Sequence, residues 1–323
     1  MARIFGILFF SLLFFGFVSH SWSQGVKYTE HTVGKHSDEV LGVFVNEDDT
    51  KVATCSLDET IKIWSIPEEK ELLLLKGHLG QVNNLSFSGS DKLLASGSGD
   101  HTIRIWDVET GEMLKTLRGH TDQVIGVYFS QDDSSTFVAS TSFDKTVKLW
   151  NWRLGSEIKT LRGHKLPTNN VAYSYDGKYL ASCSDDMTIN IWSTDLGADK
   201  PVATLLGHKA PVLTVLYNFD SSLLASSDQS GEVIIWKMPE GTRKRIIKAH
   251  NEITQDVTFA CDNKTLATAS LDGYVKLYNV ETGENIFVHN FGVPVWSVDM
   301  TCDAGVIIVG CADGTVRYLK KNY

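Results

Sequence analysis

The feature that most constrains the fold of this chain is a segment that recurs seven times. Each copy ends in a short β-branched run closed by a large apolar residue, and the copies read LDETIKIW, GDHTIRIW, FDKTVKLW, DDMTINIW, QSGEVIIW, LDGYVKLY and ADGTVRYL. The closing residues stand at positions 64, 106, 150, 192, 236, 278 and 319, so neighbouring copies are 42, 44, 42, 44, 42 and 41 residues apart. A period of this length indicates a repeat architecture in which each unit is one supersecondary element.

The pattern inside each unit is typical of β-strands. Runs such as TIRIW and TVKLW are short, β-branched and alternating, and turn residues such as Asp-Gly and Gly-Asp separate them. Each unit offers about four strands of this kind, and no stretch beyond residue 25 has a helical period. Because a four-stranded unit cannot bury both of its faces alone, the units must stack on one another. The sequence therefore predicts an all-β fold.

The Gly-His pair, the Asp turn and the Trp-Asp ending of the units resemble the WD-repeat family of β-propellers. The resemblance covers about residues 26–320 and implies a seven-bladed β-propeller that occupies residues 24–323. The last unit ends at Leu319 with only residues 320–323 left, so it lacks an outermost strand. Since KYTEHTVGKH at 27–36 aligns with the outer-strand segment EMLKTLRGH at 112–120, we expect the N-terminal strand to close the last blade.

The resemblance also implies a buried hydrogen-bonded tetrad of His, Ser or Thr, Asp and Trp in each of the first four blades. The expected tetrads are His36, Thr54, Asp58 and Trp64; His78, Ser96, Asp100 and Trp106; His120, Ser140, Asp144 and Trp150; and His164, Ser182, Asp186 and Trp192. A buried carboxylate is costly unless it is fully hydrogen-bonded, so the implied role is structural. A catalytic His–Asp–Ser site is disfavoured because an enzyme needs one such set and this chain has four.

The later blades depart from the pattern. Ser230 stands where blade five should carry its Asp, and Tyr278 replaces the Trp of blade six. Blade seven keeps only Asp313 of its tetrad, with Phe291, Val309 and Leu319 in place of the other members. We therefore expect blade seven to be the least rigid blade and the first to open.

Members of this family bind peptides or proteins across the top of the propeller, through three positions per blade around the channel mouth. None of the 21 corresponding positions is Lys or Arg, which disfavours a reader of phosphorylated peptides because such a site needs an Arg cluster. We expect a peptide with an apolar anchor and a basic residue to bind instead. The residues expected to bind it are Glu39, Leu41, Leu57, Phe143, Asp185, Leu271 and Trp296. The alternative is that these side chains only plug the channel mouth.

Residues 1–23 differ from the rest of the chain. Arg3 precedes an apolar run from Ile4 to Val18, and Ser21 and Ser23 lie just before a cleavage point at Gln24, which is the layout of a secretory signal peptide. The apolar run is shorter than the ~20 residues that span a bilayer. We therefore expect a secreted or lumenal protein, with an uncleaved anchor and a cytoplasmic or nuclear protein as alternatives.

Three further residue sets have predicted roles. Cys55, Cys183 and Cys311 share one second-strand position and read as small buried residues. Cys261 and Cys302 start equivalent turns of adjacent blades, where we expect their Cα atoms to lie beyond the ~4.4–6.8 Å that a disulfide requires. Asn263, in the sequon Asn263-Lys264-Thr265, is a glycosylation candidate if the chain enters a eukaryotic lumen. No Cys/His spacing indicates a metal site, and no motif indicates a cofactor.

These features predict a non-enzymatic scaffold that binds a protein or peptide partner. The net charge of −9 disfavours direct nonspecific binding of nucleic acid, which requires a basic field. One alternative is an intracellular subunit of a complex, such as a ligase substrate receptor, because Trp150-Asn151-Trp152-Arg153 is similar to a docking motif of such receptors. The least favoured alternative is a secreted enzyme, for which the mouth positions offer only the acids Glu39 and Asp185.

Overall fold

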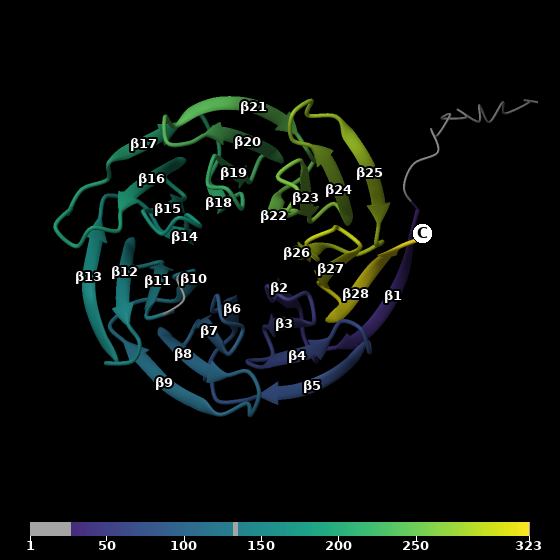
Figure 1. Cartoon of the computed structure of the whole chain (residues 1–323), viewed down its shortest axis with the longest axis horizontal. Helices are drawn as coiled ribbons and strands as arrows, with labels where there is room; N and C mark the ends of the chain where they lie inside the picture. Colours follow the sequence, from purple (N-terminus) through teal and green to yellow (C-terminus); the bar gives the residue numbers. More distant parts are fainter. Residues whose placement is uncertain (1–26, 132–134, 323) are drawn as a thin grey trace, which may run out of the picture.

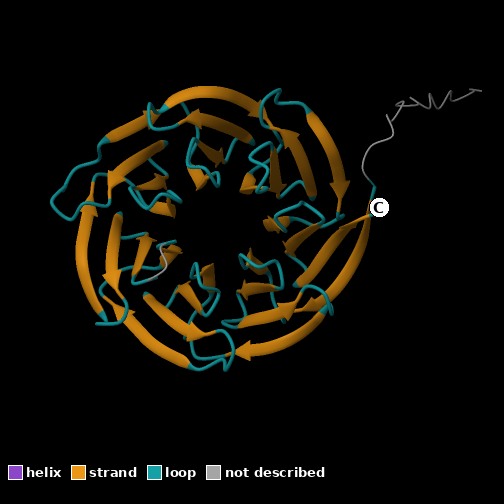
Figure 2. Ribbon diagram, in the orientation of Figure 1, coloured by secondary structure: helices purple, strands orange, loops and turns teal. Residues whose placement is uncertain are grey.

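Seven four-stranded antiparallel sheets form a ring in the computed structural model, which describes residues 27–131 and 135–322 (Figure 1). The predicted all-β class and the seven-bladed β-propeller are confirmed, and the described residues form only strands and loops in the ribbon diagram (Figure 2). In the part of the chain that the structure describes, no helix has the length and apolar character needed to cross a membrane. Residues 1–23, with the predicted signal peptide, lie outside the described residues.

Each blade consists of four strands ordered from the axis of the ring outward. The innermost strands are β2 (Val40–Val45), β6 (Val82–Phe87), β10 (Val124–Phe129), β14 (Thr168–Tyr173), β18 (Val212–Tyr217), β22 (Thr254–Phe259) and β26 (Val295–Met300). The second strands are β3 (Lys51–Ser56), β7 (Leu93–Ser98), β11 (Phe137–Ser142), β15 (Tyr179–Ser184), β19 (Leu223–Asp228), β23 (Thr265–Ser270) and β27 (Val306–Cys311). The third strands are β4 (Ile61–Ser65), β8 (Thr102–Asp107), β12 (Thr146–Asn151), β16 (Thr188–Ser193), β20 (Glu232–Lys237), β24 (Tyr274–Asn279) and β28 (Thr315–Lys321). The outermost strands are β5 (Lys70–Leu75), β9 (Met113–Arg118), β13 (Ser156–Arg162), β17 (Ala203–Leu206), β21 (Thr242–Lys248), β25 (Asn285–Asn290) and β1 (Tyr28–Lys35).

The N-terminal strand closes the ring, as the sequence predicts. Strand β1 pairs antiparallel with β28, from Tyr28 opposite Lys321 to Lys35 opposite Thr315. Side chains reinforce this pairing, because the Tyr28 hydroxyl donates a hydrogen bond of 2.7 Å to the carbonyl of Ala304. The last blade therefore combines strands from both ends of the described chain, which fixes the positions of all the other blades.

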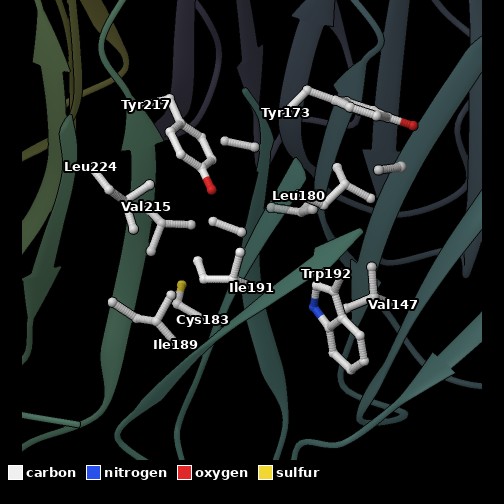
Figure 3. Close-up of a cluster of buried hydrophobic side chains, with 14 of the residues drawn as sticks. Val147, Tyr173, Leu180, Cys183, Ile189, Ile191, Trp192, Val215, Tyr217 and Leu224 are labelled. Carbon is white, nitrogen blue, oxygen red and sulfur yellow. The ribbon is translucent and has the colours of Figure 1, made fainter. Parts of the chain in front are cut away.

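The hydrophobic core lies between neighbouring blades. One cluster joins blades three, four and five, where Val147, Ile191 and Val215 come from three different sheets (Figure 3). Trp192 and Tyr217 of the same cluster are each about 1% exposed. Burial of a large apolar side chain contributes about 1.5–3 kcal/mol, so these seams are what hold each sheet upright beside the next one.

A disulfide between Cys261 and Cys302 corrects the sequence prediction that these residues lie too far apart. Their Cα atoms are 4.8 Å apart, and the amide of Cys261 donates a hydrogen bond of 3.2 Å to the carbonyl of Cys302. The prediction was wrong because blades converge toward the axis, so the turns at the ends of β22 and β26 touch directly. Cys55, Cys183 and Cys311 are free and buried.

Candidate functional site

Buried tetrads fix the loops at one end of the ring, which we call the top face. In blade one, Nδ1 of His36 lies 3.1 Å from a carboxylate oxygen of Asp58, and Nε2 lies 2.8 Å from the Thr54 hydroxyl. The indole N–H of Trp64 donates to the same hydroxyl at 2.8 Å. The backbone amide of Ser37 also donates to Asp58, so the tetrad ties the loop before β2 to the turn between β3 and β4.

The structure brings the same four side chains together in blades two, three and four. In blade two, His78 contacts Asp100 at 2.9 Å and Ser96 at 2.7 Å, and Trp106 donates to Ser96 at 2.8 Å. The corresponding contacts in blades three and four join His120, Ser140, Asp144 and Trp150, and His164, Ser182, Asp186 and Trp192. A glycine before the His makes room for the Trp, since a Cβ at Gly163 would lie 2.8 Å from the Trp192 ring.

Electrostatics fix the protonation of the tetrads. Burial lowers the pKa of His36, His78 and His120, even though the neighbouring carboxylates oppose that change. Burial alone would raise the pKa of Asp58, but hydrogen bonds from Thr60 and Ser37 and the nearby His36 lower it to about 2. In these three tetrads a neutral imidazole therefore donates Nδ1–H to a carboxylate and accepts at Nε2 from a hydroxyl.

Blade five corrects the prediction that its tetrad lacks the Asp. Nδ1 of His208 lies 2.7 Å from Asp228, Nε2 lies 2.6 Å from Ser226, and Trp236 donates to Ser226 at 2.9 Å. In blade two, Ser98 and Asp100 hold the positions that Asp228 and Ser230 hold here, so the two residue types are exchanged. The Ser230 hydroxyl donates to Asp228 at 2.7 Å. Sequence alignment missed this carboxylate because it looked only at the usual position.

Blades six and seven replace tetrad members by coupled changes. In blade six, His250 keeps its contacts with Asp272 and Thr268, while the Tyr278 hydroxyl donates to the carbonyl of Ala249 at 3.0 Å. Ala249 stands where blades two to five carry Gly. The blade-six members His250, Thr268 and Asp272 were not among the predicted tetrads, although the Ala-His pair is visible in the sequence.

Blade seven uses Arg317 instead of a His. The guanidinium donates to Asp313 at 2.6 Å and to the carbonyl of Phe291 at 3.1 Å. It also donates to Glu30 of the closing strand β1 at 3.1 Å. Phe291, which occupies the position of the His, packs under the guanidinium with 5.9 Å between the Arg317 Cζ and the ring centre. A cation–π contact and two ion pairs therefore hold the top loop of this blade.

The top face carries a cavity of about 520 Å³ around the axis, which we call the top cavity. Every innermost strand has a register shift just after its first residue, for instance between Val40 and Gly42, so one residue per blade is left out of the ladder. These unpaired residues all line the cavity, and they are Leu41, Asn83, Ile125, Asn169, Leu213, Gln255 and Trp296. A β-bulge changes the direction in which a side chain points, and here it turns these seven side chains toward the axis.

Five of the seven residues predicted to bind a partner line the top cavity, namely Glu39, Leu41, Leu57, Phe143 and Trp296. Asp185 and Leu271 lie outside its lining; Asp185 instead accepts a hydrogen bond of 2.8 Å from Asn169. Asp256, which the sequence reasoning did not single out, lies deeper on the same axis. None of the described residues that line this cavity is Lys, Arg or His.

Six segments of the chain match the family model described as WD domain, G-beta repeat, at residues 27–65, 69–107, 111–151, 155–193, 199–237 and 241–279. The chain belongs to the WD-repeat family. WD-repeat propellers generally bind proteins or peptides and are typically non-enzymatic scaffolds. The six matches end before β26, so they leave out the blade in which Arg317 replaces the usual His. A comparison with curated proteins found no match.

One group of potential metal ligands occurs among the described residues of this WD-repeat propeller: His208, Asp228 and Glu232. Both ring nitrogens of His208 are already engaged, with Asp228 and Ser226. A metal at this place would have to displace a tetrad hydrogen bond. We therefore interpret these three side chains as part of the blade-five tetrad and its surroundings, and not as a metal site.

The glycosylation candidate Asn263 lies in the turn between β22 and β23 of the WD-repeat propeller. It is half-buried, and its side-chain oxygen accepts a hydrogen bond of 3.0 Å from the amide of Phe219. Its side-chain nitrogen, the atom that would carry a glycan, donates no hydrogen bond to any described residue. Its glycosylation stays a prediction.

Proposed function

We propose that this WD-repeat propeller is a non-enzymatic scaffold that binds a peptide segment of a partner protein in the top cavity. Leu41, Leu57 and Trp296 place an apolar surface where blades one and seven meet. Glu39 and Asp256 add negative charge to the same cavity, and its described lining holds no cationic side chain. A peptide with an apolar anchor beside a basic residue fits this combination.

The observation that carries the proposal is the position of Trp296. The bulge in β26 leaves this residue out of the ladder, and it lines the top cavity together with Leu41 and Leu57. Its indole ring would cover the apolar anchor of a bound peptide.

Selection of peptides from a displayed random library against the full chain tests this proposal. Selected peptides should share an apolar anchor, and Trp296→Ala should weaken their binding about tenfold or more. Phe143→Ala should weaken it as well. Phe137→Ala is the matched control, because Phe137 and Phe143 are 37% and 38% exposed, and Phe137 begins β11 whereas Phe143 directly follows its last residue.

The decisive comparison is between the two phenylalanine variants. Loss of affinity in Phe143→Ala with no change in Phe137→Ala supports the top cavity as the binding site. Peptides that bind the wild type and all three variants equally would contradict it. A selection that yields no binding peptide would also contradict the peptide-binding proposal.

We propose further that the propeller works outside the cytoplasm. The apolar segment from Ile4 to Val18 supports this, and so does the Cys261–Cys302 disulfide, because such bonds persist mainly in oxidising compartments. The test is the intact mass of the native protein together with protease protection of isolated membranes. A protected chain that starts at Gln24 is expected; a chain that retains Met1 in the cytosol would contradict the proposal and favour an intracellular complex.

A further inference from the structure

A second cavity, of about 380 Å³, lies on the axis at the opposite end from the top face. We call it the lower cavity. The turns that follow the innermost strands form its rim, including Asn46 after β2, Phe219 after β18 and Cys302 after β26. Its size falls in the range of roughly 300–1,000 Å³ that is usual for small-molecule sites. Its two sides differ in chemistry.

One side of the lower cavity is aromatic. Tyr175 and Phe219 pack with ring centres 4.8 Å apart, and Phe44 and Tyr128 meet edge to face at 6.2 Å. Tyr128 and Tyr175 also interact electrostatically with each other, which links the two pairs. All four rings line the cavity, so blades one, three, four and five contribute one continuous aromatic wall.

The other side carries carboxylates from blades six, seven and one. Asp256 accepts hydrogen bonds from the Ser297 hydroxyl at 2.7 Å and the Val298 amide at 3.2 Å. Asp299 accepts from the Thr258 hydroxyl at 2.9 Å and from the Val45 amide at 2.8 Å. These bonds hold both side chains across the seams between blades and leave them lining the cavity.

The carboxylates on this side of the lower cavity face no positively charged side chain among the described lining residues. Glu47 and Asp49 add two more carboxyl groups near the rim, and none of the described lining residues is Lys, Arg or His. Asp256 and Asp299 are partly reachable from the cavity but enclosed by protein on their other sides, and this burial raises their pKa to about 7 and about 6. An uncompensated carboxylate in such a place favours a bound cation.

We propose that the lower cavity binds an organic ammonium ion, with its charged head between Asp256 and Asp299 and its alkyl groups against the aromatic wall. Carboxylates attract any cation, whereas the rings select one whose charge is spread over alkyl groups. The Cys261–Cys302 disulfide lines the same cavity and joins the turns of the two blades that supply the carboxylates. The disulfide thus holds together the two turns beside the proposed site.

Binding of choline to the full chain, followed by calorimetry, tests this proposal. The matched probe is 3,3-dimethylbutan-1-ol, which has the shape of choline without its charge. Choline should bind at least about tenfold more tightly than the alcohol, because the ammonium adds ion pairing and cation–π attraction. Equal binding of the two probes, or no binding of choline, would overturn the proposal.

Two variants locate the site. Asp299→Asn should weaken choline binding about tenfold by removing one carboxylate, and Phe219→Leu should weaken it several-fold by removing one ring. Because Asp299 also bonds to Val45 and Thr258, Phe219→Leu keeps the test valid if the first variant does not fold. Asp107→Asn removes a carboxylate of β8 outside the cavity lining and should leave choline affinity unchanged. Unchanged affinity in Phe219→Leu would overturn the proposal.

The pH dependence of binding is a further readout. The other titratable groups that line the cavity with Asp256 and Asp299 are Glu47, Asp49, Tyr128, Tyr175 and Tyr217. Since choline pairs with ionised carboxyl groups, its affinity should rise between pH 5 and pH 8, while binding of the neutral alcohol should stay constant. A choline affinity that is flat over this range would contradict the assigned contacts.

The ammonium group could belong to a free small molecule or to a peptide side chain. A short blocked peptide that contains trimethyl-lysine separates these sources. Tighter binding of the peptide than of choline, by about tenfold, would identify a peptide-borne ammonium. Binding of choline alone would identify a free cation. Asp256 lines both cavities, whereas Asp299 and Phe219 line only the lower one, so their variants distinguish failure of this proposal from failure of the proposed partner site.

Discussion

The Nδ1 atom of His208 lies 2.7 Å from a carboxylate oxygen of Asp228, although this Asp stands two residues before the position that carries it in other blades. Ser230 holds the usual position and donates to Asp228. The turn between β19 and β20 therefore keeps the same hydrogen-bonded groups with the order of Ser and Asp reversed. The contact that the fold requires is between side chains, and more than one sequence can provide it.

This exchange predicts the outcome of a double substitution. Asp228→Ser alone should lower the free energy of unfolding by about 3 kcal/mol, because it leaves His208 without its buried partner. Adding Ser230→Asp restores the order found in blade two and should recover most of that loss. Urea unfolding of the two single variants and the double variant measures this coupling. Additive losses in the double variant would show that blade five does not accept the usual order.

A second prediction concerns the closure of the ring. Arg317 binds Asp313, the Phe291 carbonyl and Glu30 of β1, so it replaces the tetrad and also holds the closing strand. Arg317→Met should speed amide hydrogen exchange in β1 and β28 by about tenfold or more, while β7 and β8 of blade two stay protected. If β1 and β28 exchange as slowly as β7 and β8 in the variant, the β1–β28 ladder alone closes the ring.

The wild type gives the control for that experiment. Blade seven should exchange faster than blade two even without a substitution, because it has no tetrad and joins the two ends of the described chain. Equal protection of β27 and β7 would contradict the expectation that this blade opens first. In that case the contacts of Arg317 would be as effective as a tetrad.

The repeat period was sufficient to predict the number of blades, their strand content and the closing strand, because these follow from hydrophobic pattern and length. Five of the seven residues expected at the channel mouth line the top cavity, because they stand at fixed places in the repeat, whereas Asp256 was not singled out. The lower cavity could not be predicted, because its rings come from two repeat positions, shared by Phe44 and Tyr128 and by Tyr175 and Phe219, that are not aromatic in most units and that meet only around the axis. The Cys261–Cys302 contact depends on how closely blades converge, which no single unit encodes.

The third prediction tests that disulfide. It closes a loop of 41 residues between adjacent blades, which in the loop-entropy description stabilises the fold by about 2–4 kcal/mol. Replacing both Cys261 and Cys302 by Ser should therefore lower the thermal midpoint by a few degrees. A reducing agent should lower the midpoint of the wild type equally and leave that of the double variant unchanged. A wild-type midpoint that does not respond to reduction would contradict the bond.

The fourth prediction is the dependence of stability on pH. The folded chain lowers the pKa of His250 to about 4, through burial that outweighs the attraction of Asp272, while an unfolded His titrates near 6.5. Below about pH 6.5 the unfolded chain binds more protons at this residue, so its contribution to stability is lost as the pH falls toward 4. Asp58, with a pKa of about 2, contributes stability that is lost only between about pH 3.8 and pH 2.

Asp256 changes the stability with pH in the opposite direction to His250 and Asp58. Burial raises its pKa in the folded chain to about 7, so the folded state binds the extra proton and stability falls as the pH rises from about 3.8 to 7. The other titratable groups that line the same cavity are Glu47, Asp49, Asp299, Tyr128, Tyr175 and Tyr217. Asp256→Asn removes this term, so the stability of the variant relative to wild type should rise by up to about 1.4 kcal/mol per pH unit in that window.

Urea unfolding at several values between pH 4.5 and pH 7.5 measures this difference. Asp107→Asn is a suitable control, because hydrogen bonds from Thr110 lower the pKa of Asp107 and keep it ionised throughout that range. The curve of the control should run parallel to that of the wild type, whereas the curve of Asp256→Asn should approach or cross it as the pH rises. Parallel curves for both variants would mean that Asp256 is solvated like a surface carboxylate, and would remove the electrostatic basis for a cation in the lower cavity.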